Sequence, residues 1–313
     1  MIETILNIPV LFFVFGVIAV FLGSNLEIPK GMMDGITLYL MLAIGVKGGI
    51  NLANEAITWN SFAPVLVVLV GSIIVATYMF YIARTVVSAP TAGGIAATYG
   101  SNSTMTFVTA ASFLAAIDIA FGGYMTVALV LMETPAIIYA IYLASKTQTG
   151  NIWHSLKGAL TDGTHLLLVA SLYIGFLTVR FTPNTEILYG FIRGDIFTGA
   201  LCFFLLAMGL KVGHSLRENI RENINWHLAS MAVIFPWING GLGFVAGWFL
   251  GFPPGDLFLT TILMGSASYI VAPAILSRAL PEAEIAKYLT MSIAISFPMT
   301  LLIGMPVWWA IIG

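Results

Sequence analysis

Two runs of small polar residues interrupt otherwise apolar stretches of this 313-residue sequence. The first is Ser101-Asn102-Ser103-Thr104, after Gly100, and the second is Ser266-Ala267-Ser268-Tyr269, after Gly265. Hydroxyl groups donate hydrogen bonds to the oxygens of an anion, and carbonyls freed by a helix break accept a hard cation such as sodium. We expect a second half-helix to begin near Ser103 and another near Ser268, because serine and threonine favour the N-cap of a helix, whose first N–H groups attract anions. The two runs therefore predict a site for a small anion and a cation.

Glu133 stands inside an apolar stretch, in Met132-Glu133-Thr134-Pro135. An ionised carboxylate within a lipid bilayer is costly, so an acid at this depth is by default a functional hypothesis. We predict that Glu133 and Thr134 bind the coupling ion, either sodium or a proton. The alternative is a protonated Glu133 that satisfies the backbone carbonyl freed by Pro135.

Other chemistries lack their motifs. The sequence contains no His-Glu-x-x-His, no Gly-x4-Gly-Lys-Ser/Thr and no Gly-x-Ser-x-Gly, which argues against a zinc site, ATP hydrolysis and hydrolase chemistry. Cys202 is the single cysteine, so neither a disulfide nor a cysteine-based metal site forms within the chain. No basic run indicates nucleic-acid binding. We expect no enzyme activity, no cofactor and no resident metal, with sodium as a coupling ion only.

The composition is that of a membrane protein. Hydrophobic residues make up 59% and charged residues 8% of the chain, against roughly 25% charged in soluble domains, and the mean hydropathy is +0.98. About 20 apolar residues cross the roughly 30 Å hydrocarbon core as a helix. We therefore predict ten transmembrane helices, at 8–23, 31–50, 62–87, 92–117, 121–144, 163–181, 190–213, 226–250, 256–280 and 285–311.

The basic residues predict the orientation. With the N-terminus outside, nine of the twelve Lys and Arg residues fall on the cytoplasmic side, as the positive-inside rule favours. Both termini are then outside, and we expect the protein to lie in the plasma (inner) membrane. Lys47 and Lys211 fall toward helix ends, where we expect them to snorkel to the interface, and we expect Asp34 and Asp118 to be solvated. The nine are Lys30, Arg84, Lys146, Lys157, Lys211, Arg217, Arg221, Arg278 and Lys287.

The two halves of the chain match at a near-constant offset. Residues 43–49 (AIGVKGG) align with 207–213 (AMGLKVG) at an offset of 164, and the run at 100–103 aligns with 265–268 at 165. Trp59 matches Trp226 at 167, and Pro135 matches Pro298 at 163. Such agreement indicates an internal duplication.

The duplication predicts the domain organisation. Five spans in each half require the second half to enter the membrane from the opposite side, the inverted repeat of many secondary transporters. We expect a first five-helix repeat at 1–144, a cytoplasmic linker at 145–164 with a short surface helix near Trp153 and Leu156, and a second repeat at 165–313. Helix breaks in corresponding spans, here the fourth and ninth, mark the binding site in such proteins. The alternative is that the small residues only allow close helix packing.

In these motifs the chain resembles the sodium-dependent bicarbonate permeases of the SbtA type. The matching segments are Gly45-Val46-Lys47-Gly48-Gly49, Ser103-Thr104-Met105, Met132-Glu133-Thr134-Pro135-Ala136, and Ser266-Ala267-Ser268 ahead of Pro273. The resemblance implies ten spans in two inverted repeats, a mobile core domain with crossed broken helices, and a gate domain that forms a homotrimer. It also implies sodium-coupled bicarbonate uptake.

By position, the resemblance implies substrate contacts from Ser103, Thr104 and Ser268, with Ser101 and Ser266 nearby and Glu133 close to the ions. The chain departs from the family pattern at Tyr269, where the family has an acid, and at Asn102, where it has a glycine; both residues join the expected substrate site. The central segment is shorter than the family's, which counts against a small PII-like regulatory partner.

The pattern leaves three other functions open. These are sodium/proton exchange, symport of an organic anion, and anion sensing in the membrane without transport.

Overall fold

The computed structural model describes residues 7–55, 58–145, 163–181, 192 and 194–313. Every regular element in these ranges is a helix. The linker predicted at 145–164, apart from its two ends, lies outside the described residues. The helices of the first half are α2 (Ile8–Phe21), α3 (Lys30–Asn54), α4 (Trp59–Ala83), α5 (Ala89–Gly100), α6 (Thr104–Ala116) and α7 (Tyr124–Ser145).

The second half begins with α9 (Gly163–Phe181) and α11 (Asp195–His214), which continues through a π-helical turn (Ser215–Asn219) into α12 (Ile220–Asn223). Next come α13 (Trp226–Phe249), α14 (Pro254–Gly265) and α15 (Val271–Ala279). The last helical run, Ile285–Ile312, consists of α16 (Ile285–Thr290), α17 (Phe297–Met299) and α18 (Met305–Ile312), joined by π-helical turns at Met291–Ser296 and Thr300–Gly304. These turns flank Pro298, whose missing N–H favours such a local change of the hydrogen-bond register.

The chain is a polytopic membrane protein. Six described helical segments are long and apolar enough to cross a bilayer: Lys30–Asn54, Ser61–Ala83, Tyr124–Ala144, Asp195–Glu218, Trp226–Phe249 and Ile285–Ile312. Of the other predicted spans, the first and sixth correspond to the shorter apolar helices α2 and α9. The fourth and ninth are each divided into two helices, α5 with α6 and α14 with α15.

Large apolar side chains lie on the outside of the molecule, as a lipid environment requires. Examples on α4 and α13 are 41–57% exposed. Inside, a single large cluster of buried apolar residues joins the helices of both halves. The exposed examples are Leu66, Val70, Ile74, Ile234, Leu242 and Val245.

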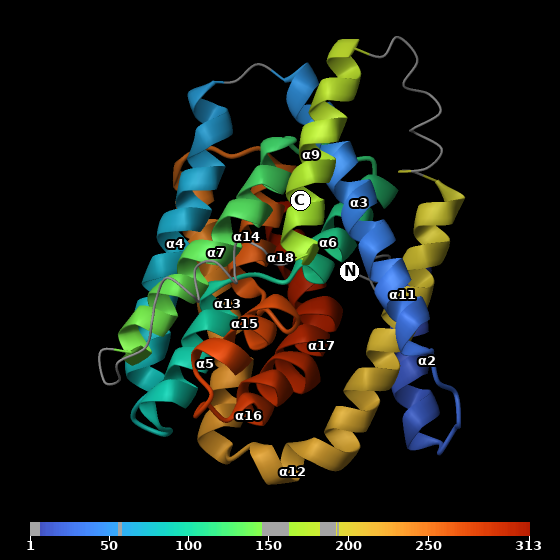
Figure 1. Ribbon diagram of the computed structural model, residues 1–313. Coiled ribbons are helices and arrows are strands. Elements are labelled where there is room, and N and C mark those ends of the chain that lie inside the picture. The colour runs from blue at the N-terminus through green and yellow to red at the C-terminus, as the bar shows by residue number, and fades with distance from the viewer. Residues whose placement is uncertain (1–6, 56–57, 146–162, 182–191, 193) are drawn as a thin grey trace.

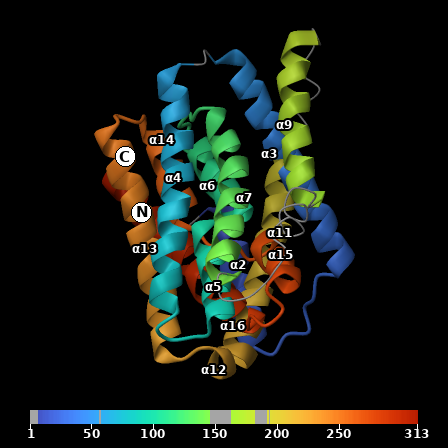
Figure 2. The same cartoon turned by 60° about the vertical axis from the view of Figure 1, so that its left-hand side comes forward.

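The helices form two groups that lie side by side (Figures 1 and 2). Helices α2, α3, α9 and α11 make up one, which we call the four-helix group, on the right of Figure 1. Within it, α3 packs along α9 and α2 packs along α11. The remaining helices form the main bundle, in which α4 packs against α5 and α7 and α13 packs against α14.

Glycines allow the two helix pairs of the four-helix group to approach closely. A Cβ on Gly49 would lie 1.9 Å from the carbonyl oxygen of Leu172 on α9. A Cβ on Gly209 would lie 2.1 Å from the carbonyl oxygen of Phe13 on α2. Any side chain at either glycine would therefore force the helices apart, which is the use of small residues that membrane packing favours.

Helix boundaries differ slightly from the sequence prediction. The third predicted span ran to residue 87, but α4 ends at Ala83 and a turn follows it. Helix α5 then begins at Ala89, three residues before the predicted span. Pro90 explains the early start, because proline is well suited to the first turn of a helix.

Candidate functional site

The first polar run is a break between α5 and α6. Helix α5 ends at Gly100, Ser101 is extended, and Ser103 is the N-cap of α6. The Ser103 Oγ accepts a hydrogen bond from the Thr106 N–H at 3.2 Å. Ser101, Asn102, Ser103 and Thr104 are all buried. The predicted break and its capping serine are therefore confirmed.

The second polar run is a break between α14 and α15. Helix α14 ends at Gly265 and α15 begins at Val271, slightly later than the expected start near Ser268. Ser268 still serves the helix, because its Oγ accepts from the Ala272 N–H at 3.2 Å. Ser266 and Ser268 are both buried.

The two breaks touch each other. The Ser103 N–H donates to the Ser266 Oγ at 3.0 Å, and the Ser268 N–H donates to the carbonyl oxygen of Thr98 at 2.8 Å. The Ser266 hydroxyl donates in turn to the Leu263 carbonyl at 2.9 Å. Residues from the two halves thus meet at one point of the main bundle, which we call the crossing. Ser266 acts there as a structural bridge.

The first break retains buried polar atoms that no described residue satisfies. These are the Ser101 Oγ, the Asn102 Oδ1 and the Thr98 Oγ1. The amide nitrogen of Asn102 does have a partner, since it donates to the carbonyl oxygen of Leu129 on α7 at 2.8 Å. Buried oxygens without partners are rare and call for a bound water, ion or ligand. The first break therefore has oxygen atoms that can form hydrogen bonds with a bound ligand or contact a bound ion.

Tyr269 lies between the crossing and α17. Its side chain is buried, its ring packs edge-to-face against Phe297 with centroids 5.3 Å apart, and its hydroxyl lies toward the side chain of Ser103. An aromatic residue at this position fills space and adds no charge.

Glu133 lies on α7, one turn after Leu129, and only 5% of its surface is exposed. Thr134, beside it, is half-buried. The Asn102 to Leu129 hydrogen bond joins the first break to this part of α7. Among the described residues, no group of three or more His, Cys, Asp or Glu side chains could hold a metal ion. A cation at the crossing would rely on carbonyl, hydroxyl and single carboxylate oxygens.

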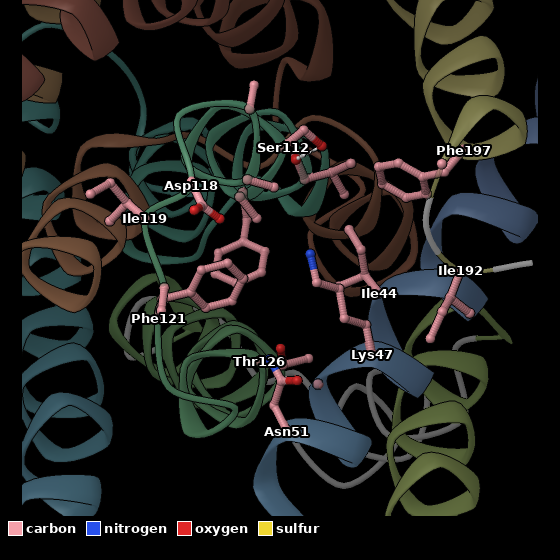
Figure 3. A pocket seen from close by; sticks show the side chains of 18 of the residues that line it. Ile44, Lys47, Asn51, Ser112, Asp118, Ile119, Phe121, Thr126, Ile192 and Phe197 are labelled. Carbon is pink, nitrogen blue, oxygen red and sulfur yellow. Dashed lines mark hydrogen bonds between the residues drawn. The ribbon is translucent and has the colours of Figure 1, made fainter. Parts of the chain in front are cut away.

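A cavity of about 740 Å³ lies next to the crossing, between the four-helix group and the main bundle. Its walls come from α3, α6, the segment 118–121, the start of α7 and the first turn of α11 (Figure 3). Phe107 and Val108 on α6 lie at its inner end, and Asp118 lies beyond the other end of that helix. The Phe107 N–H donates to the carbonyl oxygen of Ser103, so this lining begins one helical turn from the crossing.

Comparison with protein families gives one match. The model of the Na+-dependent bicarbonate transporter superfamily matches residues 9–313. The chain belongs to this superfamily. A search of curated proteins finds no significant match.

The sequence suggested that Lys47 snorkels to the membrane interface, but in this superfamily member it does not. It lies seven residues before the end of α3, about 10 Å deep along the helix axis, and its side chain points into the cavity (Figure 3). Its Nζ is 5.6 Å from the centroid of the Phe121 ring. The cavity offers the amine a polar environment at that depth. Lys211, the matching residue of the second half, is exposed, as are Asp34 and Asp118.

The protein also has a carboxylate clasp, formed by Glu55 and Asp256, that the sequence did not reveal. Glu55, which caps the end of α3, accepts from the Gly123 N–H at 2.8 and 3.1 Å through its two oxygens. Asp256 on α14 accepts from the Gly122 N–H at 2.8 Å and from the Tyr124 hydroxyl. Burial and the charge of Asp256 raise the pKa of Glu55, and the Gly123 hydrogen bond opposes this shift. The paired glycines before α7 were the only signal for the clasp in the sequence.

Proposed function

We propose that this protein is a secondary active transporter that takes up bicarbonate together with sodium. The observation that carries the proposal is the crossing of two helix breaks with unsatisfied buried oxygens, in a member of this superfamily. The crossing has donors for an anion. Ser103 and Ser268 accept hydrogen bonds from backbone N–H groups, so each hydroxyl keeps its own proton to donate. The N-terminus of α6 adds partial positive charge.

Asn102 supports bicarbonate in particular. Its Oδ1 is buried without a described partner, and its amide nitrogen is fixed on Leu129. An amide oxygen only accepts hydrogen bonds, and bicarbonate carries one O–H group that can donate to it. Chloride and nitrate have no such proton. The substrate site in this proposal comprises Ser101, Asn102, Ser103, Thr104, Ser268 and Tyr269, with Ser266 as the bridge.

For the coupling ion, the proposal assigns sodium to the neighbourhood of Glu133 and Thr134. Glu133 is buried on the helix that holds Asn102, and a carboxylate is a preferred ligand of hard cations. One sodium would also balance the charge of bicarbonate in a medium of low dielectric constant. The chain acts by this proposal as a symporter without enzyme activity or organic cofactor.

The proposed architecture is two inverted five-helix repeats, 1–144 and 165–313. Three observations support it. Trp59 and Trp226 are each the first residue of a helix, and Gly100 and Gly265 are each the last. The packing of α2 on α11 is the counterpart of α9 on α3 when the halves are exchanged. Both termini then face outward in the inner membrane, and the four-helix group is the gate through which a homotrimer forms. A PII-like regulator is not part of the proposal.

Uptake into proteoliposomes tests the proposal. Purified protein is reconstituted, and accumulation of labelled bicarbonate at alkaline pH is followed with an inward sodium gradient, with choline in its place, and with empty vesicles. We expect accumulation that requires sodium. Uptake equal to empty vesicles in sodium would rule out bicarbonate transport, and equal uptake in choline would rule out sodium coupling.

A second candidate function is sodium/proton exchange, which the buried Glu133 favours. Exchange would produce sodium-dependent pH changes in vesicles without bicarbonate, and these would disappear in Glu133→Gln.

Organic-anion symport predicts competition by carboxylates in the uptake assay. Tight bicarbonate binding without counterflow would indicate a membrane anion sensor instead.

A further inference from the structure

The cavity beside the crossing contains a positively charged side chain, that of Lys47, which is not part of the proposed substrate site. Among the described residues that line it, Lys47 is the one Lys or Arg. Its side chain extends from α3 into the cavity, between Ile44 and the ring of Phe121 (Figure 3). The contact with the ring is a cation–π interaction, which is weak where water reaches the amine. The ammonium group has three N–H donors, so it can bind an anion while it keeps contacts with the protein.

Neutral hydrogen-bonding groups lie on the same wall as Lys47. Asn51 follows it by one turn on α3 and lines the cavity, and so does Thr126 from α7. Helices α3 and α7 are close together at this level, since a Cβ on Gly48 would lie 2.4 Å from the Thr126 Oγ1. Figure 3 shows Lys47, Asn51 and Thr126 on one side of the cavity. An ammonium group with an amide and a hydroxyl beside it suits a small oxyanion.

We propose that Lys47, Asn51 and Thr126 form an outer anion site, which binds the transported anion before it reaches the crossing. The inference rests on the proposed function and orientation, which place the cavity on the outer side. Low-dielectric walls focus the field of the Lys47 charge and raise the local concentration of anions. The acids Glu55 and Asp118 also line the cavity. Glu55 is engaged by Gly123 and Asp118 is exposed, so their charges lie toward the end of the bundle and attract sodium there.

The outer anion site is separate from the crossing. The lining of the cavity reaches Phe107 on α6 and includes none of the serines of the two breaks. An anion at Lys47 therefore does not touch the serines of the breaks. Loss of the Lys47 charge should impair capture from the outside and leave the later steps of transport nearly unchanged.

Uptake kinetics test the role of the charge. We compare Lys47→Met, which removes the charge, with Lys47→Arg, which keeps it, and with Lys30→Met at the exposed start of the same helix. We expect Lys47→Met to raise the half-saturating bicarbonate concentration about tenfold, with a maximal rate within about twofold of wild type. Lys47→Arg and Lys30→Met should resemble wild type. A Lys47→Met variant with wild-type half-saturation, or with only its maximal rate reduced, would overturn the outer anion site.

A labelling assay separates this inference from the proposed function. Ser112, which lines the cavity from α6, is changed to cysteine in a Cys202→Ala background, and its reaction with a small methanethiosulfonate reagent is timed from outside. We expect bicarbonate to slow labelling when Lys47 is present and to have no effect in the Lys47→Met background. If wild type takes up no bicarbonate but shows this protection, the proposed transport fails and the outer site stands. Equal labelling rates with and without bicarbonate in the Lys47 background overturn the outer site even where transport is observed.

Discussion

The N–H of Ser103 donates a hydrogen bond to the Oγ of Ser266 at 3.0 Å, across 163 positions of the sequence. The Ser101 Oγ, at the matching position of the first half, is buried with no described partner. Two serines that align with each other in the sequence therefore have different surroundings. Ser266 connects the two breaks, whereas Ser101 is free to contact a ligand.

This difference predicts opposite phenotypes for two alanine variants. Ser266→Ala leaves the buried Ser103 N–H without its acceptor, so we expect a loss of about 1–3 kcal/mol in the free energy of unfolding. Ser101→Ala removes a hydroxyl that has no partner among the described residues, so we expect stability near that of wild type and a raised half-saturating bicarbonate concentration. Thermal unfolding in detergent without bicarbonate, together with vesicle uptake, measures both. Equal destabilisation by the two variants would contradict the assignment of Ser266 as the bridge.

Close packing of α3 on α9 predicts a strong effect at Gly49. A Cβ there would lie 1.9 Å from the backbone of Leu172, and backbone moves less readily than a side chain. We expect Gly49→Ala to destabilise by about 1–3 kcal/mol, the usual cost of overpacking. Gly35→Ala on the same helix is the control, since no atom lies within 4 Å of its Cβ position. There the change should be neutral or stabilising by up to about 1 kcal/mol. Similar melting temperatures for the two variants would refute close packing at Gly49.

Much of the fold could be predicted because apolar length and small polar runs are local signals. The breaks at Ser101 and Ser266 followed from glycine and serine within apolar stretches, and Ser103 was predicted as a cap from its residue type. Helix α15 begins at Val271 and not near Ser268, although the Ser268 Oγ still accepts a hydrogen bond from the Ala272 N–H. Sequence spacing alone does not fix such a boundary.

Features that depend on tertiary packing could not be predicted. Snorkelling is expected of a lysine on a single helix against lipid, but Lys47 lines a cavity that arises only where α3, α6 and α7 meet. The clasp joins Glu55 to Gly123 across 68 positions, and no periodic pattern connects them. The free capacity of Asn102 likewise depends on the carbonyl of Leu129, which occupies its amide nitrogen.

The clasp predicts a pH dependence of stability. Burial first, and then the charge of Asp256, raise the pKa of Glu55 above its ordinary value of 4.5. Between the ordinary and the raised pKa, the folded protein binds more protons at this site than the unfolded chain does, so its stability falls as the pH rises through that window. In Glu55→Gln the contribution disappears. We expect the melting temperature of wild type to fall relative to that of Glu55→Gln as the pH rises from about 4 to about 7. A constant difference across this range would show that Glu55 has no raised pKa.

Glu133 provides the test of coupling. Glutamine keeps an oxygen that can contact sodium but removes the negative charge that attracts it, so Glu133→Gln should lower the affinity for sodium by roughly tenfold to a hundredfold, which is about 1.4–2.8 kcal/mol. We expect the half-saturating sodium concentration for bicarbonate uptake to rise accordingly. Glu284→Gln is the matched control, since that carboxylate is exposed and pairs with Lys287. It should leave sodium dependence unchanged.

The alternative for Glu133 makes a different prediction in the same assay. If the acid is protonated and bonds the carbonyl freed by Pro135, glutamine can make the same donor contact. Glu133→Gln would then keep both the sodium dependence and the maximal rate of wild type. Uptake measured over a range of sodium concentrations at two values of pH separates the cases. A half-saturating sodium concentration that shifts with pH in wild type, and not in Glu133→Gln, would identify Glu133 as the group for which sodium and protons compete.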